Sequence, residues 1–374
     1  MNVSGKETVL RVLNRENVTV PVLSTPWCMK YELYKHCTGK DNIFSDAPKT
    51  VVDTMLALGV NFCPQFIMPS PQSEHRAIDP FQAEEVFDTH TIAPVPKPRK
   101  VFTSPEDVRD YIDSLPAPEV LAQKFDITAV AKRYAEKIQK LDILAGGKIL
   151  FIDSFGQAGF MGPLTAWGYD NYLSAMLMYT EHIKKYYEYT AESGRLKNLA
   201  IVEAVKTYNL APYVYGGQDI CYNSGPLCST ELLDEIYFPA LAKAVEPLHS
   251  AGIKIIWHCD GDIRKIVPQL VNKIRVSGFQ GFQEETGCTL EIIASQKMMD
   301  GKPPIIMGSI SVTDTLPYGT VDTVKKSVER CFEVTKRNGN PFILAPTSSI
   351  LPETPLENIL VMYETGKVYA KNPV

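Results

Sequence analysis

The feature that most constrains the fold is a regular alternation of short apolar runs with amphipathic stretches in the second half of the chain. Five apolar runs are typical of strands, and each is followed by a stretch with helical periodicity. The runs recur about every 30 residues, which is the spacing of strand–helix units in a parallel sheet. The predicted strands span residues 211–219, 253–260, 277–283, 304–311 and 341–347.

The N-terminal half of the chain shows weaker signals of the same kind. Residues 17–27, the end of the stretch 51–68, and residues 148–157 are predicted to supply three further strands. Residues 70–147 contain a proline-rich segment and two helical patterns, and we interpret them as an insertion near the barrel mouth. Since no glycine-rich dinucleotide-binding motif follows a predicted strand, the whole chain of 374 residues is predicted to be one α/β domain, a (β/α)8 TIM-type barrel.

Composition argues against several classes of partner. The chain is 45% hydrophobic and has a net charge of -5, so it can form a large core but offers no basic surface to nucleic acid or to an anionic membrane. No apolar run reaches the roughly 20 residues of a membrane span. The N-terminal residues lack the apolar centre of a secretory signal, so a cytoplasmic location is expected.

Polar side chains follow the predicted strands directly, and in a barrel the catalytic groups lie at the carboxyl ends of the strands. The most informative cluster is His258, Cys259 and Asp260, which comes directly after the apolar run IKIIW. Because side chains alternate along a strand, His258 and Asp260 should share one side and Cys259 should lie on the other. A histidine and a carboxylate that converge can bind a metal ion or transfer protons. The alternative is that they only hydrogen-bond each other and cap the next helix.

Other strand ends supply further candidates for the site. Asp219, Glu284 and Ser348 lie at or just after the predicted strands 211–219, 277–283 and 341–347. Aromatic side chains would shape a substrate pocket, although plain core packing is the alternative for each of them. The aromatic candidates are Trp27, Phe155 and Tyr222.

Four segments of the second half carry a family resemblance. They read GGQDICYNSGPLCSTELLDEIYFPALAKAVEPLHSAGIKIIWHCDGDIRKIVPQL, GFQEETGCTLEIIASQ, MGSISVTDTLPYGTVDTVKKSVER and LAPTSSILPETPLENILVM. Taken together they resemble the uroporphyrinogen decarboxylase superfamily, and the resemblance extends over roughly residues 148 to 374. This superfamily contains true decarboxylases and methyltransferases that exchange methyl groups with corrinoid proteins.

Two departures from the family pattern favour the methyltransferase branch. Decarboxylases of the family carry an arginine-rich segment after the first strand, and the matching residues 24–32 read STPWCMKYE, without arginine. They also carry an aspartate after the second strand, and the matching residues 61–70 read NFCPQFIMPS, without a carboxylate. A tetrapyrrole with eight carboxylates needs cationic partners, and the predicted mouth offers few of them.

The resemblance also bears on a metal. Methyltransferases of this kind often hold zinc with an HxC motif and a second cysteine after the last strand, and that zinc activates a thiol. Here Asp260 and Ser348 stand in place of those cysteines. His258 and Asp260, with Asp219 or Glu284 from neighbouring strands, remain as nitrogen and oxygen donors that can still bind zinc. Such donors suit an oxygen or nitrogen leaving group better than a thiol.

The sequence and the resemblance together predict a methyltransferase. Its methyl donor would be a methoxylated aromatic compound or a methylamine, and its acceptor the Co(I) corrinoid (cobalamin) of a separate partner protein, since the chain has no DxHxxG cobalamin-binding motif. His258 and Asp260, with Asp219 second, would supply the proton or cation that the leaving atom needs. Two alternatives stay open: a lyase for another carboxylated substrate, and a ligand-binding protein without catalysis.

Overall fold

The computed structural model describes residues 5–16, 21–25, 27–69 and 101–369. Five strands form one parallel sheet in the order β3–β6–β7–β8–β9, and they confirm the five strands predicted in the second half of the chain. Two shorter strands, β1 and β2, form a second parallel pair. The strands are β1 (Phe62–Cys63), β2 (Leu150–Phe151), β3 (Tyr213–Gly217), β6 (Lys254–His258), β7 (Gly278–Gln280), β8 (Ile305–Ile310) and β9 (Phe342–Pro346).

The N-terminal segment around residues 22–24 joins the two sheets on one side. Leu23 pairs in parallel with Leu344 of β9, and the next residue, Ser24, pairs in parallel with Phe62 of β1. The backbone N–H of Ser24 donates to the carbonyl oxygen of Leu344 over 2.9 Å. The first predicted strand is thus represented by two isolated parallel bridges, one to β9 and one to β1.

A second connection between the two sheets lies just beyond β2, between β2 and β3. Ser154 pairs in parallel with Tyr215 of β3, whose N–H donates to the carbonyl oxygen of Asp153 over 3.2 Å. The parallel pairings therefore run through eight segments and return to the first. This closed ring confirms the predicted (β/α)8 barrel.

Side chains that point into the ring form an apolar core of their own. Helix α1 (Gly5–Leu13) covers the amino ends of the strands, because its Val9 and Leu13 belong to this core. At β7 the inward positions are Gly278 and Gln280, which pair with Ile256 and His258. The inward apolar side chains of the other seven segments are Val22, Phe62, Leu150, Ile152, Tyr213, Tyr215, Ile256, Ile305, Met307, Ile343 and Ala345.

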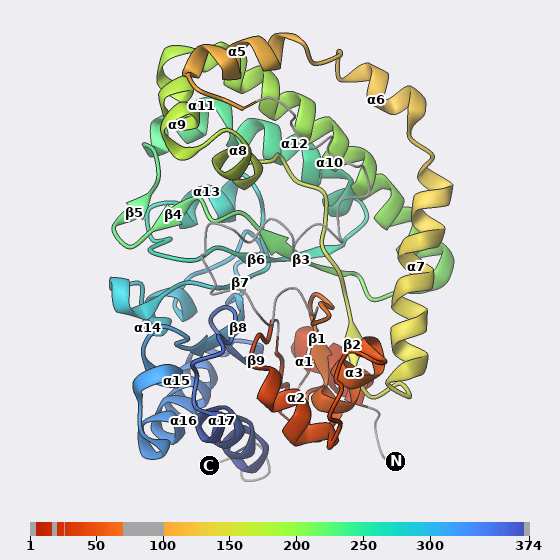
Figure 1. Cartoon of the computed structure of the whole chain (residues 1–374), viewed down its shortest axis with the longest axis vertical. Helices are drawn as coiled ribbons and strands as arrows, with labels where there is room; N and C mark the ends of the chain where they lie inside the picture. The colour runs from red at the N-terminus through yellow and green to blue at the C-terminus, as the bar shows by residue number, and fades with distance from the viewer. Residues whose placement is uncertain (1–4, 17–20, 26, 70–100, 370–374) are drawn as a thin grey trace.

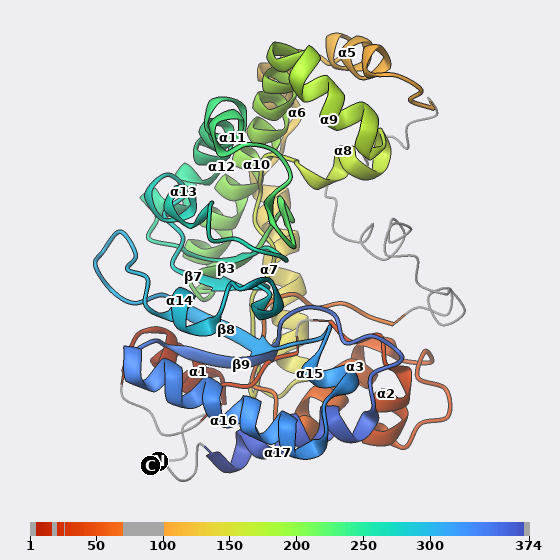
Figure 2. The same ribbon diagram turned by 90° about the vertical axis from the view of Figure 1, so that its left-hand side faces the viewer.

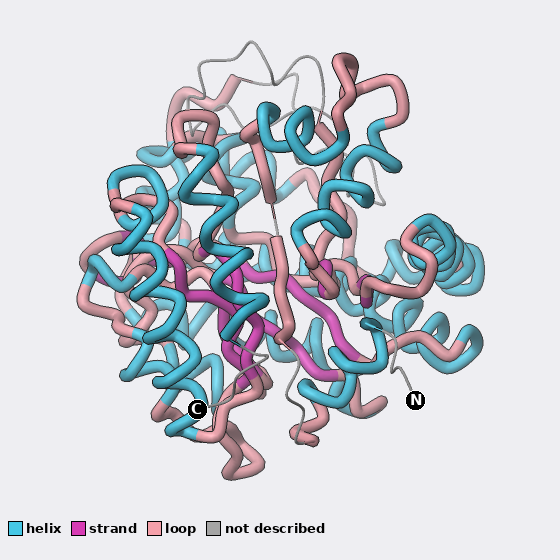
Figure 3. The backbone as a smooth tube through the Cα atoms, turned by 90° about the horizontal axis from the view of Figure 1, so that it is seen from below, coloured by secondary structure: helices cyan, strands magenta, loops and turns pink. Residues whose placement is uncertain are grey.

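Helices surround the ring, as Figure 3 shows from below. In Figure 1, α5, α6 and α8–α12 lie above the strands, and α2, α3 and α15–α17 lie below them. Figure 2 shows β8 and β9 between α14 on one side and α16 and α17 on the other. Within the described ranges, no helix combines the length and the apolar character that crossing a bilayer requires.

The helices fall between the strands as the barrel order demands. Those of the first half are α2 (Tyr31–Thr38), α3 (Ala47–Leu58), α5 (Pro105–Asp113), α6 (Glu119–Lys124), α7 (Ile127–Leu144), α8 (Met161–Ala166), α9 (Tyr169–Met178) and α10 (Thr180–Tyr208). Those of the second half are α11 (Thr230–Ile236), α12 (Phe238–Ser250), α13 (Val267–Asn272), α14 (Leu290–Ala294), α15 (Thr315–Tyr318), α16 (Val321–Asn338) and α17 (Leu356–Tyr369). A short hairpin of β4 (Cys221–Tyr222) and β5 (Gly225–Pro226) follows β3.

Local signals explain where several helices begin and end. Ser229 caps α11, because its hydroxyl oxygen accepts from the N–H of Leu232 over 3.1 Å. Gly339 ends α16 in the left-handed conformation at φ 69°, which suits glycine. Helix α13 begins at Val267, so that Pro268 falls in the first turn, where a missing N–H costs nothing.

Only part of the predicted insertion at residues 70–147 is additional to the barrel. Residues 70–100 lie outside the described residues. Helix α7 is the crossover helix between β1 and β2, since it packs against β2 and α10. Helices α5 and α6 both pack against α10 and form the additional element among the residues that the structure describes.

The contact between β7 and β8 leaves no room for a side chain at Gly278. A β-carbon there would lie 2.4 Å from the carbonyl oxygen and 2.6 Å from the β-carbon of Ile305. We expect Gly278→Ala to lower the free energy of unfolding by about 2–3 kcal/mol, because the two strands would have to separate. Gly162→Ala is the control, since a β-carbon at Gly162 meets nothing within 4 Å. Equal denaturation midpoints for the two variants would contradict the prediction.

Candidate active site

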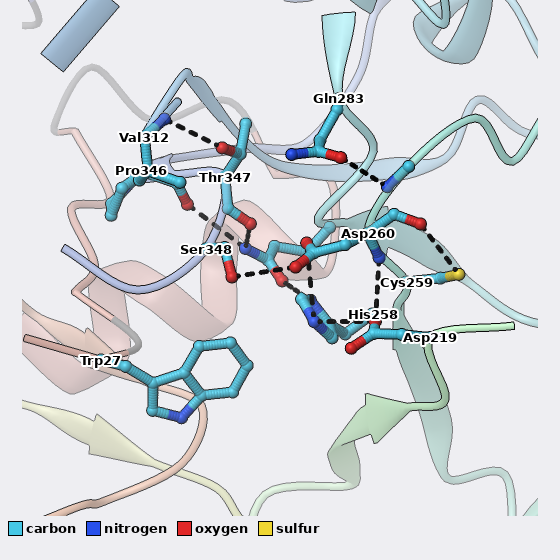
Figure 4. Close-up of polar contacts among 12 residues, drawn as sticks. Trp27, Asp219, His258, Cys259, Asp260, Gln283, Val312, Pro346, Thr347 and Ser348 are labelled. Carbon is cyan, nitrogen blue, oxygen red and sulfur yellow. Dashed lines mark hydrogen bonds and ion pairs between the residues drawn. The ribbon is translucent and has the colours of Figure 1, made fainter. Parts of the chain in front are cut away.

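The predicted histidine–aspartate pair lies at the carboxyl ends of the strands, inside the rim of the barrel. His258 is the last residue of β6, Asp260 follows two positions later, and Asp219 follows β3 by two positions. Ile256 points into the interior core whereas Trp257 packs in the outer one, so alternation turns His258 inward. Figure 4 shows the three side chains together, and it shows the sulfur of Cys259 pointing away from them, as the alternation predicts.

Short polar contacts define this cluster, which we call the mouth cluster (Asp219, His258 and Asp260). Nε2 of His258 lies 3.5 Å from Oδ1 of Asp219 and 3.8 Å from Oδ1 of Asp260. Oδ1 of Asp219 also accepts from the backbone N–H of Asp260 over 2.9 Å. The hydroxyl of Ser348, which follows β9, donates to Oδ2 of Asp260 over 3.1 Å. Four of the residues predicted for the site therefore meet at one point. Among their side-chain atoms, Oδ1 of Asp260 is buried without a hydrogen-bond partner.

Trp27 forms one wall beside the mouth cluster. Its ring lies edge-to-face to His258, with 5.1 Å between the ring centroids, and is drawn beside the cluster in Figure 4. The indole N–H donates to Oε1 of Gln65 over 3.2 Å, so the ring orientation is held from outside the cluster. Trp27 thus lies beside the mouth cluster, and its contact with a substrate stays a prediction.

The side chain of Gln280 determines which nitrogen of His258 carries a proton. Its Nε2 donates to the carbonyl oxygens of Pro346 (3.2 Å) and Thr347 (2.5 Å), so its Oε1 can only face the other way. That oxygen accepts from the hydroxyl of Tyr215 over 2.6 Å and contacts Nδ1 of His258. Since an amide oxygen cannot donate, Nδ1 must be the protonated nitrogen. In the neutral imidazole the lone pair therefore lies on Nε2, the nitrogen that faces the two aspartates.

The protonation of Asp260 is unusual for a carboxyl group. Burial raises the pKa of Asp260 to about 7, and the nearby carboxylate of Asp219 acts in the same direction. His258 and the hydrogen bond from Ser348 oppose this rise without cancelling it. Near neutral pH the group therefore exists in both forms, as suits a residue that exchanges protons.

The donor atoms of the mouth cluster fit a small divalent cation. One ligand atom from each of Asp219, His258 and Asp260 lies within 4.8 Å of the others. A tetrahedral zinc with bonds of about 2.0–2.2 Å separates its ligand atoms by about 3.3–3.6 Å, close to the distances from Nε2. The hydrogen bond from Nδ1 to an amide oxygen is the support that a ligating histidine usually has. Cys259 is no fourth ligand, since its thiol is buried on the other side and burial raises its pKa well above the ordinary value.

The remaining predicted residues lie elsewhere. Glu284 is not part of the mouth cluster, because its carboxylate accepts from Arg330 of α16 (2.7 Å), from Ser309 (2.8 Å) and from the N–H of Leu290 (3.0 Å). Phe155 packs against Trp257 in the core between strands and helices. Tyr222 is half-exposed on the β4–β5 hairpin, and its carbonyl oxygen accepts from the N–H of Asp262.

Gln280 is the functional candidate that sequence reasoning missed. It lies inside the predicted strand 277–283, where attention to strand ends selected Glu284 instead. The available signal was a glutamine at an inward position of a short apolar strand, where a buried polar side chain needs partners. It is fully buried in the structure.

Comparisons with known proteins show similarity in sequence and in fold. Residues 168–369, more than half of the chain, match the uroporphyrinogen decarboxylase (URO-D) family. Methylcobamide:CoM methyltransferase MtaA of Methanosarcina barkeri (strain Fusaro / DSM 804) is 26% identical over 158 residues, which span 42% of this chain and 43% of that protein. The structure of a methyltransferase from Methanosarcina mazei shares the fold, with a TM-score of 0.61, 17% identity, and coverage of 98% of this chain and 99% of the other.

Without the Gln280 amide, His258 should no longer be fixed in the tautomer that carries its proton on Nδ1. In Gln280→Met the Nδ1 proton loses its acceptor, so the lone pair on Nε2 is no longer enforced and affinity for Zn²⁺ should fall about 10- to 100-fold. Nitrogen NMR of the imidazole should show the Nδ1–H tautomer in the metal-free wild type and a mixture in the variant. Gln283→Met is the control, because Gln283 contacts the N–H of Gly261 and not the histidine. An unchanged tautomer in Gln280→Met would refute this role.

The pKa of Asp260 has a consequence for stability. The folded protein holds the proton on Asp260 more tightly than the unfolded chain does. The protonated carboxyl group therefore contributes fully to the free energy of unfolding below about pH 4, and this contribution is lost as pH rises through about 7. Asparagine resembles the protonated carboxyl at every pH. In metal-free protein, the Tm advantage of Asp260→Asn over wild type should grow from pH 4 to pH 7, reach about 2–4 °C, and stay constant above pH 7.

Thermal unfolding followed by circular dichroism at several pH values checks this expectation. The exposed Asp41 supplies the matched control, and Asp41→Asn should show no such growth with pH. If the Tm difference between Asp260→Asn and wild type were the same at pH 4 and pH 8, the raised pKa of Asp260 would be contradicted.

Proposed function

The chain belongs to the uroporphyrinogen decarboxylase family, and we propose that within it this protein is a methyltransferase that moves a methyl group from a methoxylated aromatic compound or a methylamine to a corrinoid protein. The observation that carries the proposal is the mouth cluster, in which Nε2 of the His258 imidazole faces two carboxylates. The similarity to a methylcobamide-dependent methyltransferase supports the choice of reaction class.

The charge of the mouth cluster argues against decarboxylation of a tetrapyrrole. A substrate with many carboxylates needs several arginine or lysine partners, and residues 24–32 and 61–70 supply no arginine and one lysine, Lys30, which pairs with Glu32. Asp219 and Asp260 would repel such a substrate directly. A neutral methyl ether or an amine avoids this repulsion.

Oxygen and nitrogen donors determine which cation the mouth cluster would take. His258, Asp260 and Asp219 would hold a divalent ion such as Zn²⁺, which when bound polarises the leaving oxygen or nitrogen as a Lewis acid. Nothing in the cluster is a thiolate, because Asp260 and Ser348 occupy the positions where cysteines would stand. This donor set favours a hard leaving atom over the sulfur of a thiol.

The residues of the chain perform the proton transfer and the positioning. In the proposed step the bond between the methyl carbon and the heteroatom breaks, and its electron pair stays on the heteroatom. The corrinoid of the partner protein supplies the electron pair of the new bond to the methyl carbon. When no cation is bound, protonated Asp260 would donate its proton to the leaving oxygen or nitrogen, and the hydroxyl of Ser348 would orient the carboxyl group. When a cation is bound, Asp260 would be one of its ligands, and the cation would stabilise the leaving atom instead. Trp27 gives an aromatic donor a flat surface beside His258.

An activity assay with substituted variants tests the proposal. Wild-type protein, Co(I) corrinoid protein and a panel of methoxyarenes and methylamines should give methyl transfer, read from the absorbance change of the corrinoid. His258→Ala should lower kcat/KM about 10²- to 10⁴-fold, because it removes a ligand of the cation and the neighbour of the Asp260 proton. The exposed His36 supplies the control, and His36→Ala should keep full activity.

Two outcomes would contradict the proposal. Turnover of a carboxylated tetrapyrrole, without methyl transfer from any donor, would make the protein a lyase. Tight binding of a methylated donor by wild type, with no transfer to Co(I), would make it a binding protein.

A further inference from the structure

A second cavity lies at the opposite end of the barrel from the mouth cluster. It has a volume of about 270 Å³ and is bounded by residues 13–15 after α1, 249–254 before and at the start of β6, 275–277 before β7, and 298–305 before β8. All of these segments lie at or before the amino ends of their strands. We call this cavity the basic pocket, after the four cations that line it: Arg15, Lys254, Arg275 and Lys302.

The basic pocket carries a surplus of positive charge on an acidic protein. Only one carboxylate, that of Asp300, is among its lining residues, and it lies 3.7 Å from Lys302. Arg275 is paired outside the lining with Glu246, over 2.5 Å. Four cations less these two carboxylates leave a charge of about +2, whereas the whole chain has a net charge of -5.

Arg15 and Lys254 carry this surplus. Arg15 donates to the carbonyl oxygen of Pro303 over 2.5 Å, and Lys254 donates to the hydroxyl of Tyr213 over 3.1 Å. Both partners are neutral, and in the described part of the chain neither cation has a carboxylate within ion-pair distance. Burial lowers the pKa of Lys254, and the nearby Arg15 and Lys302 lower it further. The cations therefore repel one another without a full complement of anions.

The backbone holds two of the cations in an uncommon conformation. Arg15 has φ 65° and Arg275 has φ 53°, in the left-handed region that residues with a β-carbon rarely adopt. Asn209 is the one other residue besides glycine with a positive φ in the described ranges, and asparagine tolerates it well. Such strain persists where something compensates for it, and both arginines line the same cavity.

We propose that the basic pocket binds a phosphate group, either as inorganic phosphate or as the end of a phosphate monoester. A phosphate carries about -1.5 to -2 charges near neutral pH, which matches the surplus of the pocket. Arginine guanidinium groups match the oxygens of phosphate in geometry, and lysine adds a compact charge. The volume of about 270 Å³ accommodates one such group but not a large ligand.

The bound anion would join segments that are distant in the sequence. Arg15 follows α1, Lys254 begins β6, and Lys302 precedes β8. Phosphate should therefore stabilise the end of the barrel that α1 covers, and it should do so whatever happens at the mouth cluster.

Calorimetric titration with inorganic phosphate, at constant ionic strength set with chloride, measures this binding. Thermal unfolding under the same conditions provides a second readout, and glycerol phosphate provides the monoester arm. Wild type should bind phosphate with a rise in Tm, and Arg15→Asn and Lys254→Gln should each weaken binding at least tenfold. Asparagine is chosen because it tolerates the left-handed backbone of Arg15. Lys326→Gln, at an exposed lysine of α16, is the control and should bind as wild type does.

The comparison between the two anions identifies the source of the phosphate. Tighter binding of the monoester would indicate a phosphorylated metabolite as the ligand, and tighter binding of inorganic phosphate would indicate the free ion. No binding by wild type, or equal binding by Lys254→Gln and Lys326→Gln, would overturn the proposal.

Discussion

Closure of the backbone into one ring of parallel segments decides where each functional side chain of this protein lies. The single pairings at Leu23, Ser24 and Ser154 bring segments from both ends of the chain beside the five-stranded sheet. Because all strands are parallel, their carboxyl ends meet at one rim, and residues as distant as Asp219 and Ser348 come together there. The amino ends meet at the other end, where α1 covers the core. The two ends thus acquire separate chemistry from one topological constraint.

Much of this fold could be predicted from the sequence, and the limits have physical causes. The strands of the second half are apolar on both faces because helices cover the outside and side chains fill the inside, so each gives a clear apolar run. The limits of the strands in the first half could not be predicted from apolar runs. β1 and β2 are two residues long, and the first segment pairs only through single bridges. Helix α7 was assigned to an insertion, because its role as a crossover depends on its contact with β2, which no local pattern reports.

For the site too, the sequence predicted the features that depend on local residues and missed those that depend on distant contacts. Alternation along β6 correctly predicted that His258 and Asp260 face inward and that Cys259 does not, because a period of two is a local property. The partners of Glu284 could not be predicted, since Arg330 lies 46 residues away on α16. Gln280 was missed for a related reason. Its importance lies in joining Tyr215, His258 and the backbone of Thr347, which belong to three other segments of the ring.

The opposite charges of the two ends bear on what each can bind. At the mouth, two carboxylates face one imidazole, and the pKa of about 7 at Asp260 limits the negative charge by keeping a proton there part of the time. A cation or a proton can satisfy this arrangement, whereas a polycarboxylate would raise its energy. At the amino end, Arg15 and Lys254 hydrogen-bond neutral groups and share the nearby Asp300 within the described structure, so an anion would lower the energy of that end. The proposed methyl transfer and the proposed phosphate site thus depend on opposite charges at the two ends of one barrel.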